Sequence, residues 1–402
     1  MITSGARSVP VQPEWKVPLS DVLVDEEILN AATDAVLSGW WSMGPRVDQF
    51  ERAFAEYCGR RYAFAVSNGT AALHLALVAT GCGPGDDVIV PSLNFVAAAN
   101  VISHTGARPV FCDVVGPCDL NLDPADVEAA VGPATKAIMV LHYGGFPCDI
   151  GSVLEIAGRH GLVVIEDAAH APGARWHGAM CGTFGIAGCF SFFANKNLAV
   201  GEGGMIVTDD EDVAAQIRLL RSHGMTTLTW ARHQGHAHAY EVVARGFNYR
   251  ADEVRAAIGL VQLRRLADAN RARGRIVERY RSALDGVAGI RMPFAAGDGD
   301  LVSAHHLAVV VLPDDGLQSA VRASMNDGGV QTSIHYPPIH RFAAYADEPV
   351  RPLPETDRVS GRILTLPLYA HMSDSQVEHV VDRLIEAVAQ ASAAHSGSNP
   401  RR

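Results

Sequence analysis

The chain has 402 residues, 48% of them hydrophobic and 19% charged, which is an ordinary globular balance and is long enough for one large and one smaller domain. Its formal net charge is -11 and it has no dense run of Lys and Arg, which argues against a nucleic-acid-binding surface. No apolar stretch approaches the ~20 residues that span a bilayer, and residues 1–16 lack a hydrophobic signal core, so we expect a cytoplasmic protein without a membrane partner.

Short apolar runs alternate with helical patterns along the first 250 residues. Strands are predicted at 63–66, 87–90, 109–114, 136–142, 162–167 and 205–208, and helices at 70–79, 124–131 and 150–160. This alternation indicates an α/β fold with a mostly parallel sheet covered by helices on both faces. In such sheets ligands bind beyond the carboxyl ends of the strands, where we look for the site.

The pattern changes after residue 248. A long helix rich in Ala and Arg is predicted over 252–273, followed by a smaller α/β segment with a strand at 307–312. We therefore expect a large domain over 12–250 and a smaller C-terminal domain over 251–390. The two tails, 1–11 and 391–402, consist of small and polar residues and are expected to be flexible.

One helix is predicted to begin directly after a strand, in Ser67-Asn68-Gly69-Thr70. Asn68 or Thr70 can cap this helix. The free N–H groups and the dipole at the helix start favour a phosphate, although a plain cap without a ligand is equally compatible with the pattern. Phe95 follows the strand at 87–90, where it could stack on a flat heterocycle or lie in the core.

A carboxylate and a histidine follow the predicted strand at 162–167. Asp167 ends this buried strand, and a buried carboxylate is costly unless it is paired. Its partner could be a protonated pyridine nitrogen, an arginine or the start of the next helix. His170 lies one helical turn beyond Asp167 on the same face, where it could contact the same ligand or lie in the core.

Lys196 lies between an apolar, strand-like run at 190–194 and a glycine-rich turn at 201–204, in a chain with few lysines. Partial desolvation lowers the pKa of an amine at such a place. A neutral amine is what a Schiff base with an aldehyde cofactor requires, whereas the alternative is a solvated loop lysine. Ser191 could hold a phosphate oxygen near Lys196, or bond to the backbone as an ordinary strand serine.

The cysteines and a cluster of histidines give little sign of a metal. The seven cysteines are scattered and form no CxxC pair, which indicates reduced thiols and not a zinc site or a disulfide framework. His233, His236 and His238 lie in a segment without Cys, Asp or Glu. A metal site is conceivable there, but we expect a solvated or substrate-facing loop and no metal.

Taken in order, these motifs resemble the DegT/DnrJ/EryC1/StrS family of fold-type I, pyridoxal-phosphate-dependent aminotransferases. The resemblance covers nearly the whole chain, from 37–45 through 246–250 and 259–263 to His335-Tyr336-Pro337. The motifs that carry most of it are Asn68-Gly69-Thr70, Glu166-Asp167-Ala168-Ala169-His170, Ser191 with Lys196-Asn197, and Glu202-Gly203-Gly204. Each is weak alone, but their ordered conjunction is specific.

The resemblance implies a role for each matching residue. Lys196 is the Schiff-base lysine that also carries the proton during transfer, and Asp167 pairs with the pyridine nitrogen of pyridoxal 5'-phosphate. The other implied cofactor contacts are Gly69, Thr70 and Ser191 at the phosphate, Phe95 over the ring and His170 near the ring hydroxyl. Asn248 is implied to reach the phosphate from the neighbouring subunit, so the resemblance implies a homodimer with shared active sites.

The resemblance also implies the reaction. The enzyme would move an amino group in two steps from glutamate or glutamine to a keto sugar, most often one linked to a nucleotide, in the biosynthesis of amino sugars, antibiotics or polysaccharides. Lys196 favours transamination over the dehydration performed by members with histidine there. A free keto-cyclitol is an alternative acceptor, and the loops at 40–45, 223–238 and 335–340 are expected to bind the acceptor. A non-catalytic regulator that binds the cofactor is a further alternative, against which the intact Lys196, Asp167 and Ser191 argue.

Overall fold

The structure is a computed structural model that describes residues 15–227, 230, 239–287, 289–294 and 300–397. The histidines at 233, 236 and 238 and the predicted N-terminal tail lie outside the described residues. None of the described helices combines the length and the hydrophobicity needed to cross a bilayer.

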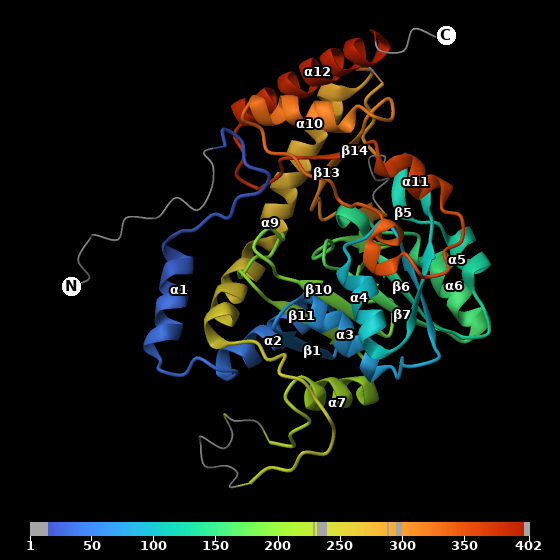
Figure 1. Cartoon of the computed structure of the whole chain (residues 1–402). Coiled ribbons are helices and arrows are strands. Elements are labelled where there is room, and N and C mark those ends of the chain that lie inside the picture. The colour runs from blue at the N-terminus through green and yellow to red at the C-terminus, as the bar shows by residue number, and fades with distance from the viewer. Residues whose placement is uncertain (1–14, 228–229, 231–238, 288, 295–299, 398–402) are drawn as a thin grey trace.

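A seven-stranded sheet forms the centre of the larger part of the molecule (Figure 1). In spatial order its strands are β1 (Tyr62–Val66), β11 (Gly204–Thr208), β10 (Ala187–Ser191), β7 (Val163–Asp167), β6 (Thr135–Leu141), β2 (Asp87–Pro91) and β3 (Arg108–Cys112). Neighbouring strands are parallel except at β11, which is antiparallel to both of its neighbours. The prediction of a mostly parallel sheet in an α/β fold is therefore confirmed.

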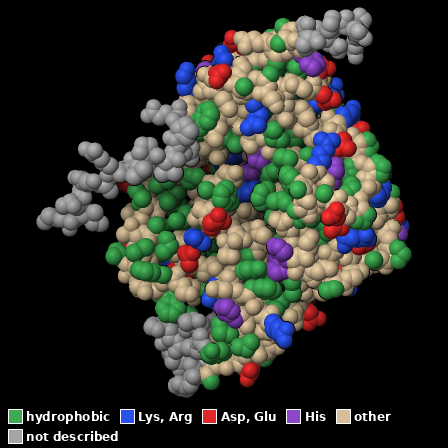
Figure 2. Space-filling view, in the orientation of Figure 1, with side chains coloured by type: hydrophobic (Ala, Val, Ile, Leu, Met, Phe, Trp, Pro, Cys, Tyr) green, Lys and Arg blue, Asp and Glu red, His purple; other side chains and the backbone are tan. Residues whose placement is uncertain are grey.

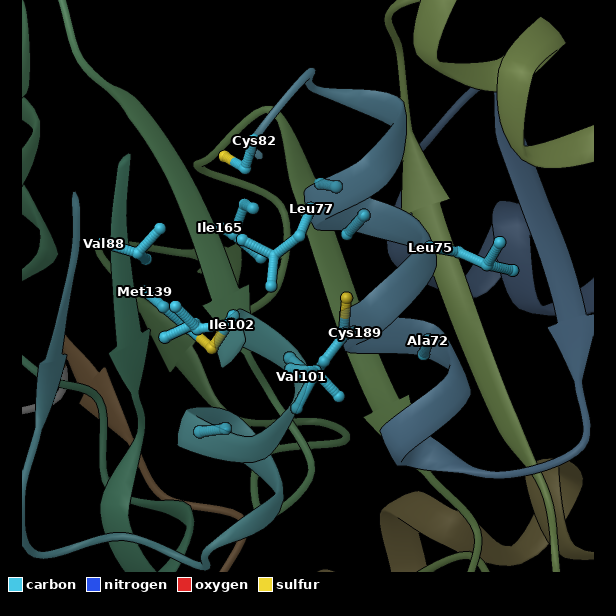
Figure 3. Close-up of a cluster of buried hydrophobic side chains, with 14 of the residues drawn as sticks. Ala72, Leu75, Leu77, Cys82, Val88, Val101, Ile102, Met139, Ile165 and Cys189 are labelled. Atoms are coloured by element: carbon cyan, nitrogen blue, oxygen red, sulfur yellow. The ribbon is translucent and has the colours of Figure 1, made fainter. Parts of the chain in front are cut away.

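Helices cover both faces of this sheet because its strands are apolar on both sides. One face packs against α3 (Gly69–Ala79), α4 (Ala97–Thr105) and α7 (Glu211–Leu220), as Figure 3 shows for part of the cluster. The opposite face packs against α2 (Pro45–Cys58), α5 (Pro124–Ala130), α6 (Ile150–His160) and the first half of α9 (Glu253–Leu284). The side chains alternate accordingly, with Ile165 and Val164 of β7 in clusters on opposite faces.

The strand predicted at 109–114 is interrupted at Asp113. The backbone N–H of Asp113 donates to the carboxylate of Asp126 (2.8 Å). The carboxylate of Asp113 accepts from the N–H groups of Glu355 (2.9 Å) and Thr356 (2.6 Å). Asp113 thus caps α11 (Pro354–Ser360), a helix whose own N-cap residue provides no side-chain acceptor. A hairpin of β4 (Val114–Gly116) and β5 (Asp119–Leu122) follows.

The long helix α9 runs from the larger part of the molecule toward α10 and α12 (Figure 1). Its side chains contribute to two hydrophobic cores. It continues to Leu284, beyond the predicted end at 273, because Ile276, Val277 and Tyr280 extend its apolar face into a second core. That core also contains residues of α10 (Gln318–Asp327), α12 (Asp374–Gly397), β13 (Ala308–Val311) and β14 (Ile363–Leu366). A flexible tail was predicted to begin at residue 391. Helix α12 continues past that residue as far as Gly397. The division of domains at 250 stays a prediction.

The remaining elements are short or peripheral. They are α1 (Glu26–Leu37), β8 (Arg175–Trp176), β9 (Ala179–Met180), β12 (Leu301–Val302) and the 3-10 helices Tyr143–Gly145, Ile339–Arg341 and Ala343–Tyr345.

Candidate active site

A cavity of about 430 Å³ lies beyond the carboxyl ends of the central strands, where the parallel topology predicts a ligand. The space-filling view shows this face of the molecule hollowed, with histidine and basic side chains inside the hollow (Figure 2). Seven of the eight predicted site residues line the cavity, and they are Gly69, Thr70, Phe95, Asp167, His170, Ser191 and Lys196. These seven residues, which lie up to 127 positions apart in the sequence, therefore meet at one place.

One end of the cavity is formed by the start of α3. The side chain of Asn68 caps the helix by accepting from the N–H of Ala71 (2.8 Å), which confirms the predicted cap. The N–H groups of Gly69 and Thr70 belong to the first turn, where the helix supplies no acceptor. Ser191, at the end of β10, packs so closely that a Cβ on Gly69 would lie 2.8 Å from the Ser191 Cβ. Helix dipole, N–H groups and hydroxyl together favour an anion such as phosphate.

The floor of the cavity carries the carboxylate of Asp167, which is only 5% exposed. Burial raises its pKa, whereas the backbone N–H of Ala169 (3.1 Å from Oδ1) and the nearby Lys196 act in the opposite direction. The Asn94 amide is close enough to favour the charged carboxylate, but its buried Nδ2 has no hydrogen-bond partner within 3.5 Å. A buried carboxylate in this setting is matched by a ligand that brings a positive charge or a donor.

The prediction that a helix follows Asp167 is wrong. Residues 168–173 form successive turns, because Pro172 and Gly173 disfavour helix. His170 nevertheless reaches the cavity. Its Nδ1 accepts from the N–H of Gly144 (3.3 Å), and burial lowers its pKa well below the ordinary value, so the ring is neutral. Its Nε2 therefore carries the hydrogen and donates to the hydroxyl oxygen of Tyr336 (2.8 Å).

Tyr336 is a site residue that the sequence analysis assigned only to a family motif and a predicted acceptor loop. Its ring lies 5.8 Å from that of Phe95, and both rings line the cavity. Because His170 donates to its oxygen, the hydroxyl hydrogen of Tyr336 is available to the cavity. Phe95 is 55% exposed and is thus not a core residue.

Lys196 enters the cavity from the loop after β10. Desolvation lowers its pKa to about 8, although the carboxylate of Asp167 favours the charged form. The Lys196 Nζ atom lies 3.4 Å from Nε2 of His306. His306 is 110 residues away and was not predicted from the sequence; the only local signal was the pair His305-His306 ahead of the strand at 307–312.

A chemical measurement can check the lowered pKa of Lys196. In the cofactor-free protein, the rate of Lys196 labelling by trinitrobenzenesulfonate is expected to rise with pH through a midpoint near 8, because only the neutral amine reacts. Peptide mass spectrometry separates Lys196 from Lys16 and Lys136, the only other lysines of the chain. A midpoint above pH 10 would show a solvated, ordinary lysine.

Asn248 is the predicted site residue that the structure leaves out of this cavity. It is exposed and forms a backbone bridge with Ser222. Of the loops predicted to bind an acceptor, the one at 335–340 contributes His335 and Tyr336 to the cavity. Residues 40–45 do not line it, and most of 228–238 lies outside the described residues.

Comparison with known proteins agrees with the fold. The model of the DegT/DnrJ/EryC1/StrS aminotransferase family matches residues 23–385. The chain is 41% identical over 381 residues to the spore coat polysaccharide biosynthesis protein SpsC of Bacillus subtilis, covering 92% of this chain and 97% of that protein.

Two solved structures are also similar to this chain. The aminotransferase TlmJ of Streptoalloteichus hindustanus superposes with a TM-score of 0.86 at 38% identity, covering 94% of this chain and 100% of that one. The PLP-form of the putative sugar aminotransferase Spr1654 of Streptococcus pneumoniae superposes with a TM-score of 0.87 at 26% identity, covering 93% of this chain and 99% of that one. On this evidence the chain belongs to the DegT/DnrJ/EryC1/StrS aminotransferase family.

Proposed function

We propose that the protein is a pyridoxal-phosphate-dependent aminotransferase that moves an amino group from glutamate or glutamine to a keto sugar linked to a nucleotide. The observation that carries the proposal is the cavity in which an amine of lowered pKa at Lys196, a buried carboxylate at Asp167 and a helix N-terminus at Gly69 meet.

The residues of the cavity fit pyridoxal phosphate. Two polar atoms of its lining, Nδ2 of Asn94 and Oδ1 of Asn195, are buried without a hydrogen-bond partner. An unsatisfied buried polar group is costly, so such atoms indicate a polar ligand. The phosphate matches the start of α3 with Ser191, and the ring nitrogen matches Asp167.

Each residue then has a distinct task. When bound, pyridoxal phosphate supplies an aldehyde that receives the amino group and a ring that withdraws electrons. The carboxylate of Asp167 favours a protonated ring nitrogen, which strengthens this withdrawal. Lys196 Nζ would move a proton between the reacting substrate carbon and the aldehyde carbon of the bound cofactor, a role for which a pKa near the working pH is favourable. Phe95 and Tyr336 line the cavity and would contact the flat ring of the cofactor.

The choice of a sugar acceptor is supported by relatives. SpsC is named for spore coat polysaccharide biosynthesis, and Spr1654 is described as a putative sugar aminotransferase. A free keto-cyclitol is the competing acceptor, because the residues that bind the cofactor do not distinguish the two. Amination of keto-sugar nucleotides, without amination of keto-cyclitols, is the result that supports the nucleotide-linked acceptor.

A homodimer with shared active sites is part of the proposal. Phe95 and Phe193 line the cavity and are 55% and 45% exposed, an apolar rim that a second copy would cover. Asn248, exposed and outside the cavity of its own chain, would then serve the phosphate site of the other copy.

Reduction with borohydride tests the proposed function directly. After incubation with pyridoxal phosphate, borohydride is expected to fix the cofactor on Lys196 alone. Lys16 and Lys136 serve as internal controls in the same peptide map, since the chain has only three lysines. Cofactor on either of them, or on no lysine, would reject the proposal.

The close approach of Gly69 and Ser191 gives a second test. Gly69→Ala is expected to raise the Kd for pyridoxal phosphate by about tenfold or more, because the new Cβ, 2.8 Å from the Ser191 Cβ, displaces the hydroxyl from the phosphate. Gly158→Ala is the matched control. Gly158 lies in α6 with no atom within 4 Å of its added Cβ, so the affinity stays unchanged and the free energy of unfolding rises by about 0.5–1 kcal/mol. Equal affinities in both variants would remove Gly69 from the phosphate site.

A further inference from the structure

A row of buried, hydrogen-bonded side chains leads from Lys196 away from the cavity. The Nζ of Lys196 lies 3.4 Å from Nε2 of His306, and Nδ1 of His306 lies 3.0 Å from Oδ1 of Asn197. Asn197 in turn contacts Asn270 on α9 (2.8 Å). The last three side chains are at most 8% exposed, so bulk water does not compete for these contacts.

Two backbone carbonyls determine the direction of each hydrogen bond in this row of side chains. Nδ2 of Asn270 donates to the carbonyl of Pro172 (2.9 Å), which can only accept, so Oδ1 of Asn270 faces Asn197. Nδ2 of Asn197 donates to this oxygen and to the carbonyl of Ala304 (2.7 Å). Oδ1 of Asn197 therefore faces His306 and accepts the hydrogen of Nδ1.

The His306 ring is thus left with a lone pair on Nε2, directed at Lys196. A second hydrogen on Nε2 would place two cationic donors against each other. Burial and the charged or titratable neighbours of His306, which are Lys196, His170, His335 and Arg273, all lower its pKa and keep the ring neutral.

We propose that His306 is a positioning residue for Lys196: its Nε2 accepts a hydrogen bond from the lysine amine, while Asn197 and Asn270 hold the ring in the Nδ1–H tautomer. The contact orients the Lys196 amine and favours its ammonium form. It therefore influences the point in the reaction at which Lys196 releases and takes up a proton. Only this consequence rests on the proposed function; the tautomer and the hydrogen bond do not.

The unaltered protein provides the first test. In cofactor-free protein labelled with [15N]histidine, long-range 1H–15N correlation at pH 7.5 is expected to show His306 as neutral, with hydrogen on Nδ1 and none on Nε2. Loss of the signal in a His306 variant assigns it. Hydrogen on Nε2, or a doubly protonated ring, would overturn the proposal.

A matched pair of variants provides the second test. The amide of glutamine can place an acceptor near the position of Nε2, whereas that of asparagine can replace only Nδ1. His306→Gln is therefore expected to keep the pH midpoint of Lys196 labelling near 8, and His306→Asn to lower it by about one unit, because a hydrogen bond that favours the ammonium is lost. A midpoint that is equal in the two variants, or that rises in His306→Asn, contradicts the proposed role.

Both measurements use the protein without cofactor, so they separate this inference from the proposed function. If borohydride fixes no cofactor on Lys196 but the tautomer and the midpoints are as expected, the proposed function fails and the contact stands. If the cofactor is fixed on Lys196 while His306 carries hydrogen on Nε2, the function stands and the positioning role is rejected. Should both variants fail to fold, a third folded variant at position 306, such as His306→Phe, assigns the signal, and the tautomer of the unaltered protein decides.

Discussion

Lys196→Ala is expected to lower kcat/KM for amino transfer by about 10⁴-fold, because the variant loses both the group that bonds the cofactor and the group that moves the proton. Thermal unfolding of the cofactor-free variant should occur at the same or a higher temperature, since an amine whose pKa falls on burial opposes folding while it is charged. Initial rates with glutamate and a keto-sugar nucleotide, together with the melting temperature, measure both effects.

Lys136→Ala is the matched control for this loss. Lys136 is exposed at the start of β6 and does not line the cavity. Its replacement should leave the rate within about twofold of the parent, because surface substitutions away from a site have small effects. Similar losses in the two lysine variants, or a Lys196→Ala enzyme with near-parental rates, would contradict the role given to Lys196.

Asp167→Asn is expected to lower kcat by about 10²- to 10³-fold without loss of stability. The amide cannot provide the negative charge that keeps the ring nitrogen protonated. Burial raises the pKa of Asp167, so this carboxyl favours folding below its unfolded pKa, and that contribution is lost as the pH rises through the folded pKa. At neutral pH the charged form opposes folding, and the variant should melt at the same temperature or higher. Asp167→Ala should likewise stay soluble and lose turnover.

The adjacent carboxylate of Glu166 should behave in the opposite way. It is fully buried and accepts from the N–H groups of Gly182 (2.6 Å), Phe184 (2.6 Å) and Gly185 (2.7 Å), and from Nε2 of His142 (3.0 Å). Glu166→Gln should therefore lower the free energy of unfolding by about 2–4 kcal/mol while the folded fraction keeps most of its turnover. Urea unfolding and kcat per folded molecule test the contrast. If Glu166→Gln loses turnover and Asp167→Asn loses stability, the two roles are assigned the wrong way round.

Local sequence patterns were sufficient where a structure depends on neighbours in the chain. The strand that ends at Asp167 and the Asn68 cap depend on nearby residues, and both form as predicted. Predictions failed where a distant contact or a nearby proline overrode the pattern. Asp113 ends its strand early because it caps a helix through Glu355, 242 residues later, and Pro172 replaces the expected helix after Asp167 with turns.

The sequence by itself determined the fold class and most strand ends, because hydrophobic periodicity and capping act over a few residues. The role expected of Lys196 came from the ordered set of motifs that resembles the family, since the local pattern also fits a solvated loop lysine. Only the tertiary structure decided which groups surround that lysine. His306 and Tyr336 reach the site from segments more than 100 residues beyond Lys196, and Asn270 contacts Asn197 from the middle of α9. Desolvation and hydrogen-bond direction, which set the pKa of Lys196 and the tautomer of His306, arise only when these segments pack together.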